Sequence, residues 1–181
     1  MTVLLEQYIA FLQEMPYMHS SGKTTTDDPS GDRNVHGTDS KTNEYRRGKE
    51  KGLVKKISEL DGHHIYRSKS TSKYGDDHRR YYAVHPETDT VHMSLAGGRT
   101  ETDLDDDKER FETSELGSHS KNKLPSENFY HHILMHHEPH LISDTRLTPG
   151  SKKTWERLSK KPGAKVNLQP YDSVESHTAD R

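Results

Sequence analysis

The stretch YYAVHPETDTVHMSL, residues 81–95, decides the fold because it predicts a hairpin of two β-strands. Aromatic and β-branched residues on both sides of a short polar segment are typical of paired strands. The turn is predicted at residues 86–89, and Gly97-Gly98 predict where the second strand ends. The apolar residues of the two strands are Tyr81, Tyr82 and Val84, then Val91, Met93 and Leu95.

A second hairpin is predicted just upstream, over residues 52–67. Its turn is Asp61-Gly62, a pair that favours the tight two-residue turn of hairpins. Residues 110–116 predict an edge strand that follows the two hairpins. The middle of the chain is therefore expected to form an antiparallel meander.

The last third of the chain changes to a helical period. A helix is predicted over residues 126–138, followed by a short strand at residues 140–143. Thr148-Pro149-Gly150 predicts the start of a further helix, because proline is favoured at the first helical position. Val166 and Leu168 predict a final strand.

The N-terminal residues predict a helix, and two polar stretches predict irregular structure. Apolar residues recur three and four apart over residues 2–15, which predicts an amphipathic N-terminal helix. Residues 17–50 are expected to form a long polar loop, mobile unless a ligand orders it, and residues 171–181 a frayed tail. We therefore expect one α+β domain over residues 1–181, with an N-terminal helix, an antiparallel meander, and then helix, strand, helix, strand.

The composition predicts a small folded core that carries long polar segments. Leu, Ile, Val and Phe make up 29 of the 181 residues, below the ~20% at which disorder becomes a serious alternative. Disordered chains usually carry a large net charge, and here the formal net charge is only -2. A pI of about 6.7 argues against a dedicated nucleic-acid-binding protein.

The sequence lacks the residues for cysteine chemistry, for a membrane-spanning helix and for a secretory signal. The chain has no Cys, so disulfides, thiolate zinc sites and cysteine nucleophiles are ruled out. No apolar run approaches the ~18 residues that span a bilayer. No basic region precedes the first apolar stretch, so we expect no secretory signal and a cytoplasmic protein.

The predicted order of elements resembles the GCN5-related N-acyltransferase fold over residues 52–170. In that family a Gln/Arg-x-x-Gly-x-Gly/Ala loop binds the pyrophosphate of coenzyme A through backbone N–H groups. This chain instead has Ala96-Gly97-Gly98-Arg99 and then an acidic stretch. The stretch from Asn128 to Leu158 also resembles small bacteriophage proteins with an acyltransferase-like end. The resemblance implies a fold that has lost, or never had, acetyl-CoA chemistry.

A dense group of histidines lies in and after the helix predicted over residues 126–138. His132 and His136 are one helical turn apart, a spacing that can hold a metal ion, with His140 or Glu138 as the third ligand. His137 falls on the buried face of that helix, so it is the candidate for catalytic acid or base chemistry. A solvated or hydrogen-bonded cluster that follows from the chain's 14 His is the simpler interpretation.

The segment His92-Met93-Ser94 in the predicted strand resembles half of the motif of the two-histidine phosphoesterases. There the histidine is the general acid or base and the hydroxyl helps to hold the phosphate. His92 and Ser94 are therefore candidate catalytic residues, with His36 and Thr38 as the second half. The abundance of Ser and Thr predicts such pairs by chance as well.

A candidate anion site follows the short strand at residues 140–143. Loops between a strand and a helix N-terminus are where α/β proteins place ligands. Lys152 and Lys153 oppose the helix dipole unless an anion is present. The candidate ligand-binding residues are Ser143, Asp144, Arg146, Lys152 and Lys153; the alternative is that Asp144 and Arg146 simply pair.

Every catalytic motif in the sequence is incomplete, which favours a binding function. We expect a small soluble accessory protein, encoded by a phage, that binds a host protein or an anionic, nucleotide-like ligand. The alternatives are an acetyl-CoA-dependent N-acyltransferase, a two-histidine phosphoesterase and a histidine-cluster metal-binding protein. The sequence identifies no cofactor.

Overall fold

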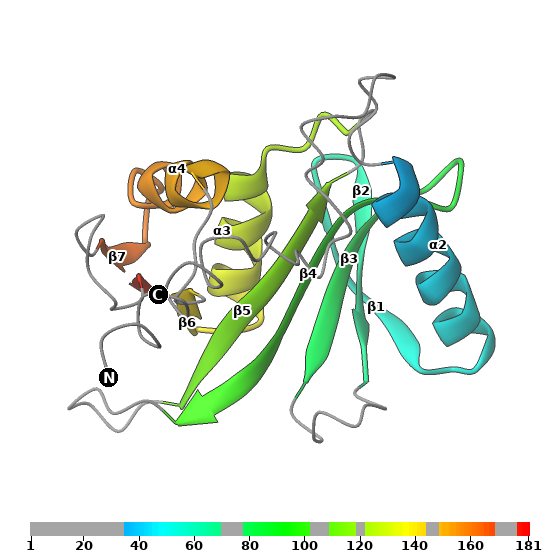
Figure 1. Cartoon of the computed structure of the whole chain (residues 1–181), viewed down its shortest axis with the longest axis horizontal. Coiled ribbons are helices and arrows are strands. Elements are labelled where there is room, and N and C mark those ends of the chain that lie inside the picture. The colour runs from blue at the N-terminus through cyan, green and yellow to red at the C-terminus, as the bar shows by residue number, and fades with distance from the viewer. Residues whose placement is uncertain (1–34, 70–77, 102–108, 119–121, 144–148, 169–176) are drawn as a thin grey trace, which may run out of the picture.

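A computed structural model describes residues 35–69, 78–101, 109–118, 122–143, 149–168 and 177–181 of the chain. In this part, three helices pack on one eight-stranded sheet (Figure 1). The helices are α2 (Val35–Glu50), α3 (Ser126–His136) and α4 (Pro149–Leu158). The strands are β1 (Val54–Leu60), β2 (His63–Ser68), β3 (Arg79–His85), β4 (Thr90–Glu101), β5 (Glu109–Ser118), β6 (His140–Ser143), β7 (Lys165–Asn167) and β8 (Thr178–Asp180).

The sheet has the strand order β1-β2-β3-β4-β5-β6-β8-β7. Neighbouring strands are antiparallel except β5 and β6, which run parallel and are joined through α3. An antiparallel meander followed by helix, strand, helix and strand is the α+β order that the sequence predicts. The prediction of the fold class is therefore confirmed.

Both predicted hairpins are present in the structure. Asp61 and Gly62 have φ angles of 45° and 77°, as the turn between β1 and β2 requires. The predicted end of the second hairpin at Gly97-Gly98 is wrong, because β4 continues to Glu101. A Cβ atom on Gly97 would lie 2.6 Å from the ring of Phe111, so this glycine allows β5 to approach closely.

The helix α2 occupies the last part of the segment expected to be a polar loop over residues 17–50. Only Thr42 and Tyr45 are buried among its described side chains, too few to show a helical period in the sequence. Tyr45 packs in a small cluster under α2, which contains Val54, Tyr82, Val84 and Val91. The predicted helix at residues 2–15 lies outside the described residues.

Two predictions about strands are corrected. The strand at residues 110–116 was expected at an edge, but β5 lies between β4 and β6. The predicted frayed tail contains β8, which pairs with β6 and β7. Ala179 is the buried residue of this three-residue strand, so backbone pairing rather than an apolar pattern holds it in place.

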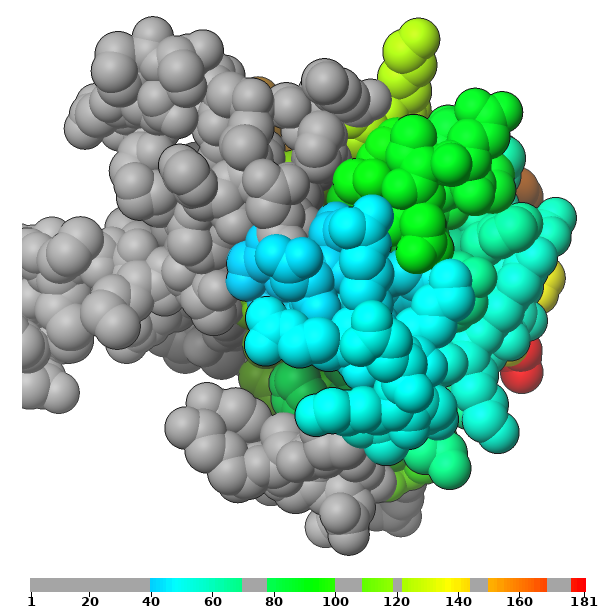
Figure 2. Space-filling view, turned by 90° about the vertical axis from the view of Figure 1, so that its right-hand side faces the viewer, coloured from blue at the N-terminus to red at the C-terminus, as the bar shows by residue number. Residues whose placement is uncertain are grey.

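The helices cover opposite faces of the sheet. Successive strand residues point to opposite faces: Tyr81 belongs to the core under α3 and α4, and Tyr82 to the cluster under α2. Figure 2 shows α2 and the β1–β2 hairpin together on one side of the molecule. The larger core under α3 and α4 includes Ile65, Leu95, Phe111, Phe129, Ile133, Leu134, Leu141, Trp155 and Leu158.

Among the described residues, no helix combines the length and the apolar character that crossing a bilayer requires.

Candidate functional site

The parallel strands β5 and β6 separate in the middle of the sheet. They pair from Phe111–Leu141 to Thr113–Ser143, and Ser114 is then an extra residue in β5, forming a β-bulge opposite β4. Beyond the bulge, within the described part of the chain, β5 pairs with β4 alone. We call this point the fork; the carboxyl ends of parallel strands are where α/β proteins bind ligands.

Polar side chains gather at the last β5–β6 pair. The backbone N–H of Ser143 donates to the carbonyl of His177 (2.8 Å), and the N–H of His177 donates to Ser143 Oγ (2.8 Å). The ring of His177 lies 6.0 Å from that of Trp155. Burial lowers the pKa of His177, and the charge of Lys152 lowers it further, so this imidazole is neutral at neutral pH.

Side chains of α3 and α4 lie on the same face of the sheet as this pair. Thr113 Oγ1 donates to the carbonyl of Ile142 (3.3 Å) and also contacts the phenol of Tyr130. Burial raises the pKa of Tyr130 to about 12, so its hydroxyl stays protonated. Trp155 Nε1 is buried without an acceptor among the described residues. We call Thr113, Tyr130, Ser143, Trp155 and His177 the fork cluster.

The predicted anion-binding residues lie partly at the fork. Ser143 belongs to the fork cluster, and Lys152 and Lys153 lie in the first turn of α4, which has no acidic residue. Asp144 and Arg146 lie outside the described residues. Sequence reasoning missed His177, which falls in the predicted tail, and assigned no binding role to Trp155. The sequence offered one signal for this residue: Trp155 is the single Trp of a chain that is poor in apolar residues.

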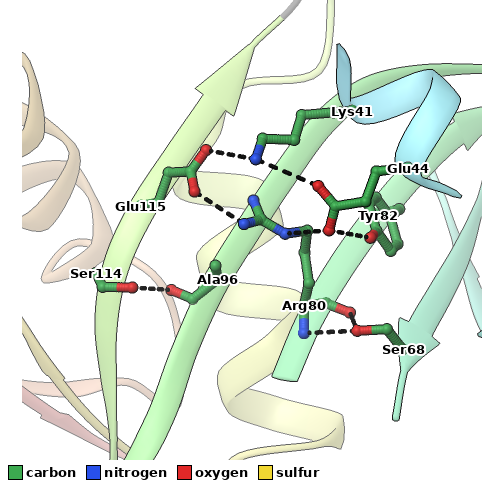
Figure 3. Close-up of polar contacts among 8 residues, drawn as sticks. All are labelled: Lys41, Glu44, Ser68, Arg80, Tyr82, Ala96, Ser114 and Glu115. Atoms are coloured by element: carbon green, nitrogen blue, oxygen red, sulfur yellow. Dashed lines mark hydrogen bonds and ion pairs between the residues drawn. The ribbon is translucent and has the colours of Figure 1, made fainter. Parts of the chain in front are cut away.

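An ionic network joins α2 to the other face of the sheet (Figure 3). The carboxylate of Glu115 lies 2.9 Å from Arg80 Nη2 and 3.1 Å from Lys41 Nζ. Glu44 of α2 lies 3.2 Å from Arg80 Nε and 3.4 Å from Lys41 Nζ. The hydroxyl of Tyr82 donates to Glu44 (3.0 Å). We call these five residues the α2 network.

The charge states within the α2 network follow from these contacts. Burial alone would raise the pKa of Glu115, but hydrogen bonds and charges from Arg80 and Lys41 outweigh it and lower the pKa. The carboxylate is thus ionised and fully engaged by two cations. It holds α2 on the sheet, and it is poorly suited to be a general base because its pKa lies far from neutrality.

Histidines from α3 meet a serine of the edge strand β1. Ser58 Oγ lies 2.8 Å from His132 Nε2 and 3.0 Å from His137 Nε2. The rings of His132 and His136 are 4.7 Å apart. Burial, reinforced by the charge of His136, lowers the pKa of both His132 and His137 to about 4. Both imidazoles are therefore neutral at neutral pH.

The three predicted metal ligands do not form one group. His140 Nδ1 lies 2.9 Å from Asp180 of β8, whereas His132 and His136 face each other on α3. In the part of the chain that the structure describes, no three His, Asp or Glu side chains are arranged to hold a metal ion. The predicted one-turn spacing brings His132 and His136 together. His140 instead turns toward β8.

The residues of the predicted phosphoesterase motif lie on opposite faces of the sheet. A bulge in β4 places Val91 in the cluster under α2 and Met93 in the core under α3. His92 therefore lies on the α3 face, where its Nδ1 is 3.0 Å from His63 Nε2. Ser94 lies on the α2 face, next to Gly117. His36 and Thr38 are in helix α2 rather than in a second strand.

A basic surface covers the end of α2 and the start of β1. Residues 46–56 contain six Lys or Arg and one acidic residue, Glu50. This surface lies on the side of the molecule that Figure 2 shows. Its exposed cations include Arg46, Arg47, Lys49, Lys51 and Lys55. Residues 46–56 carry a formal charge of +5, within a chain whose formal net charge is -2.

No protein-family model matches the sequence, and a search of curated proteins found no match.

Proposed function

We propose that the protein acts by binding an anionic, nucleotide-like ligand at the fork. The observation that carries the proposal is the separation of β5 from β6 directly after the Thr113–Ser143 pair. Beyond that pair, one edge of β5 has no strand partner among the described residues. Backbone N–H and C=O groups on such an edge can pair with an extended ligand.

The side chains at the fork suit the negative part of such a ligand. Lys152 and Lys153 bring two cations to the first turn of α4, where the helix dipole also favours an anion. Trp155 Nε1 is a buried donor beside them, and leaving such a donor without an acceptor costs about 1–3 kcal/mol. A phosphate or carboxylate oxygen would supply the acceptor.

Binding at the fork is favoured over the catalytic motifs predicted from the sequence, because each of those motifs is incomplete. Glu115 is held by two cations, and His92 and Ser94 lie on opposite faces of the sheet. Acyl transfer from acetyl-CoA is the second candidate, supported by the parallel β5–α3–β6 crossover within an order of elements similar to the acyltransferase fold. Acetyl-CoA is thus the first ligand to test.

The test is a thermal melt of the full chain with coenzyme A, acetyl-CoA or ADP. A ligand that binds only the folded state raises its stability by about 2.7 kcal/mol at a hundredfold excess over the dissociation constant. We expect an upward shift that disappears in the triple variant Arg146→Glu, Lys152→Glu, Lys153→Glu. The matched variant Lys160→Glu, Lys165→Glu should keep the shift.

A melt that is unchanged by all three compounds would contradict the nucleotide-like ligand. Product formation from acetyl-CoA and an amine would favour the acyltransferase over simple binding. A shift that survives the triple variant would place the ligand away from the fork.

A protein partner is the alternative that the basic surface favours. Exposed cations attract an acidic surface over long range, and the attraction weakens as salt rises. A phage protein acting on a host protein in the cytoplasm would fit this interpretation. Binding to polyglutamate should then weaken in Arg47→Glu, Lys51→Glu, Lys55→Glu and should fall between low and high salt. Equal binding by the variant would reject the basic surface as the contact.

A further inference from the structure

We propose that Ser58 is a nucleophile that accepts acyl groups from carboxylic esters, with the imidazoles of His132 and His137 handling its proton. The site lies between the edge strand β1 and α3, so it goes beyond ligand binding at the fork and does not depend on it. The juxtaposition that carries the proposal is one hydroxyl within hydrogen-bond distance of two imidazole Nε2 atoms.

A bulge in β1 aims Ser58 at α3. Lys56 pairs with Tyr66 and Ser58 with Ile65, so Ile57 is an extra residue in the strand. Ile65 belongs to the core under α3, and the residue paired with it shares that face. Bulges commonly redirect a side chain in this way next to active sites.

The two histidines must adopt complementary proton arrangements. A hydroxyl has one hydrogen, so Ser58 can donate to only one of the two Nε2 atoms. The other Nε2 must carry a hydrogen and donate it to Ser58 Oγ. One imidazole is therefore placed to accept the proton of the hydroxyl, as in serine–histidine hydrolases. The second can hold the oxygen in position.

The surroundings keep the histidines neutral and oriented. His137 stacks on Tyr81 with ring centroids 6.0 Å apart, and the Tyr81 hydroxyl donates to the buried carboxylate of Glu138. Burial lowers the pKa of His132 and His137 to about 4, which leaves a lone pair for the proton at neutral pH. The charges of His136 and Arg67 add to the effect of burial at His137.

The reaction balances with an ester and water alone. Ser58 Oγ attacks the carbonyl carbon while its proton moves to Nε2 of one histidine. The bond from the carbonyl carbon to the alcohol oxygen breaks, and the leaving alcohol takes that proton. Water then attacks the acyl-serine, gives one proton to the same Nε2, and releases the acid as Ser58 regains its hydrogen. A weakly basic imidazole predicts slow turnover, so covalent capture is the better measurement.

The first experiment uses the absence of Cys from the chain. In Ser58→Cys every thiol reaction reports on this position. The Nε2–H that donates to the atom at position 58 would stabilise a thiolate there, which lowers the pKa of the thiol and speeds its reaction. We expect iodoacetamide at pH 6.5 to alkylate it about tenfold faster than Ser68→Cys, a half-buried position whose hydroxyl contacts the backbone of Arg80. Adding His132→Asn and His137→Asn to Ser58→Cys should lower its alkylation rate to that of Ser68→Cys.

The second experiment treats the unchanged protein with a fluorophosphonate probe and maps the adduct by mass spectrometry. We expect one adduct on Ser58, none in Ser58→Ala and an unchanged adduct in Ser68→Ala, with thermal melts showing that both variants fold. The proposal requires both results. Alkylation of Ser58→Cys at the rate of Ser68→Cys, no adduct, or an adduct on another residue each overturns it.

Discussion

The two faces of the sheet are covered by different means. Under α3 and α4 lies a continuous apolar core that includes Phe129, Leu141 and Trp155. Under α2 a few aromatic and aliphatic side chains are supplemented by the α2 network of buried and half-buried charges. A chain with few aliphatic residues thus places most of its buried ones on one face and supplements the smaller cluster on the other face with ion pairs.

Phe129→Ala tests the apolar face and should have the largest effect. The side chain of Phe129 is fully buried, and removing a buried Phe side chain typically costs about 3–5 kcal/mol. Urea unfolding followed by circular dichroism measures the loss. Leu168→Ala is the matched control, because Leu168 is 39% exposed and should change stability by less than about 0.5 kcal/mol. Similar losses in the two variants would contradict the assignment of the core.

Glu115→Ala tests the face under α2. Removing one partner of a buried ion pair typically costs about 3–5 kcal/mol, because it leaves an uncompensated charge. We expect about 3 kcal/mol here, since Glu44 still contacts both Arg80 and Lys41. Urea unfolding again gives the value.

A double variant sharpens the comparison of the two faces. Replacing a buried pair by apolar residues of similar volume is often neutral or stabilising. Arg80→Met with Glu115→Leu should therefore recover most of the stability lost in Glu115→Ala. A double variant as unstable as Glu115→Ala would mean that the α2 network cannot be replaced by apolar packing.

The difference between the faces also explains what the sequence could predict. The hairpins, α3, β6 and α4 follow from apolar patterns and turn residues, and these predictions are confirmed. Helix α2 was missed because it is held by Tyr45 and by ion pairs, which leave no apolar period. β8 was missed because Ala179 is its buried residue and backbone pairing does the rest.

The candidate site was predicted only where local spacing determines it. The one-turn spacing of His132 and His136 correctly brings their rings together. The meeting of Ser58 with this helix depends on a bulge in β1 and on the packing of α3 across the sheet, and neither leaves a local pattern. His92 and Ser94 lie on opposite faces because a bulge in β4 changes the alternation.

The histidines that face Ser58 predict a pH dependence of stability. The pKa of His132 and His137 is about 4 in the folded chain, against about 6.5 when unfolded. Between these values the unfolded chain binds more protons, so stability falls as the pH drops from 6.5 toward 4.

The variant His132→Asn, His137→Asn should therefore lose less Tm between pH 7.5 and 4.5 than the unchanged protein. His131→Asn is the control, because the ring of His131 contacts the carbonyl of Pro162 instead. The same pH dependence in all three proteins would show that the two histidines do not titrate as their burial requires.

The smallest effect is expected at Asp89, where α2 contacts the β3–β4 turn. Its carboxylate accepts hydrogen bonds from Tyr45 (3.0 Å) and Lys49 (3.0 Å). Asp89 has a φ of 50°, and asparagine tolerates this left-handed conformation as well as aspartate does. Asp89→Asn thus removes the charge while keeping the turn and the bond from Tyr45.

Since the pair with Lys49 is largely exposed, we expect Asp89→Asn to lower the free energy of unfolding by about 0.2–1 kcal/mol in low salt. The loss should shrink in 1 M salt, because the pair is screened. A loss that is equally large in high salt would mean that Asp89 holds α2 through hydrogen-bond geometry and not through charge, so that ion pairs anchor this helix only within the α2 network.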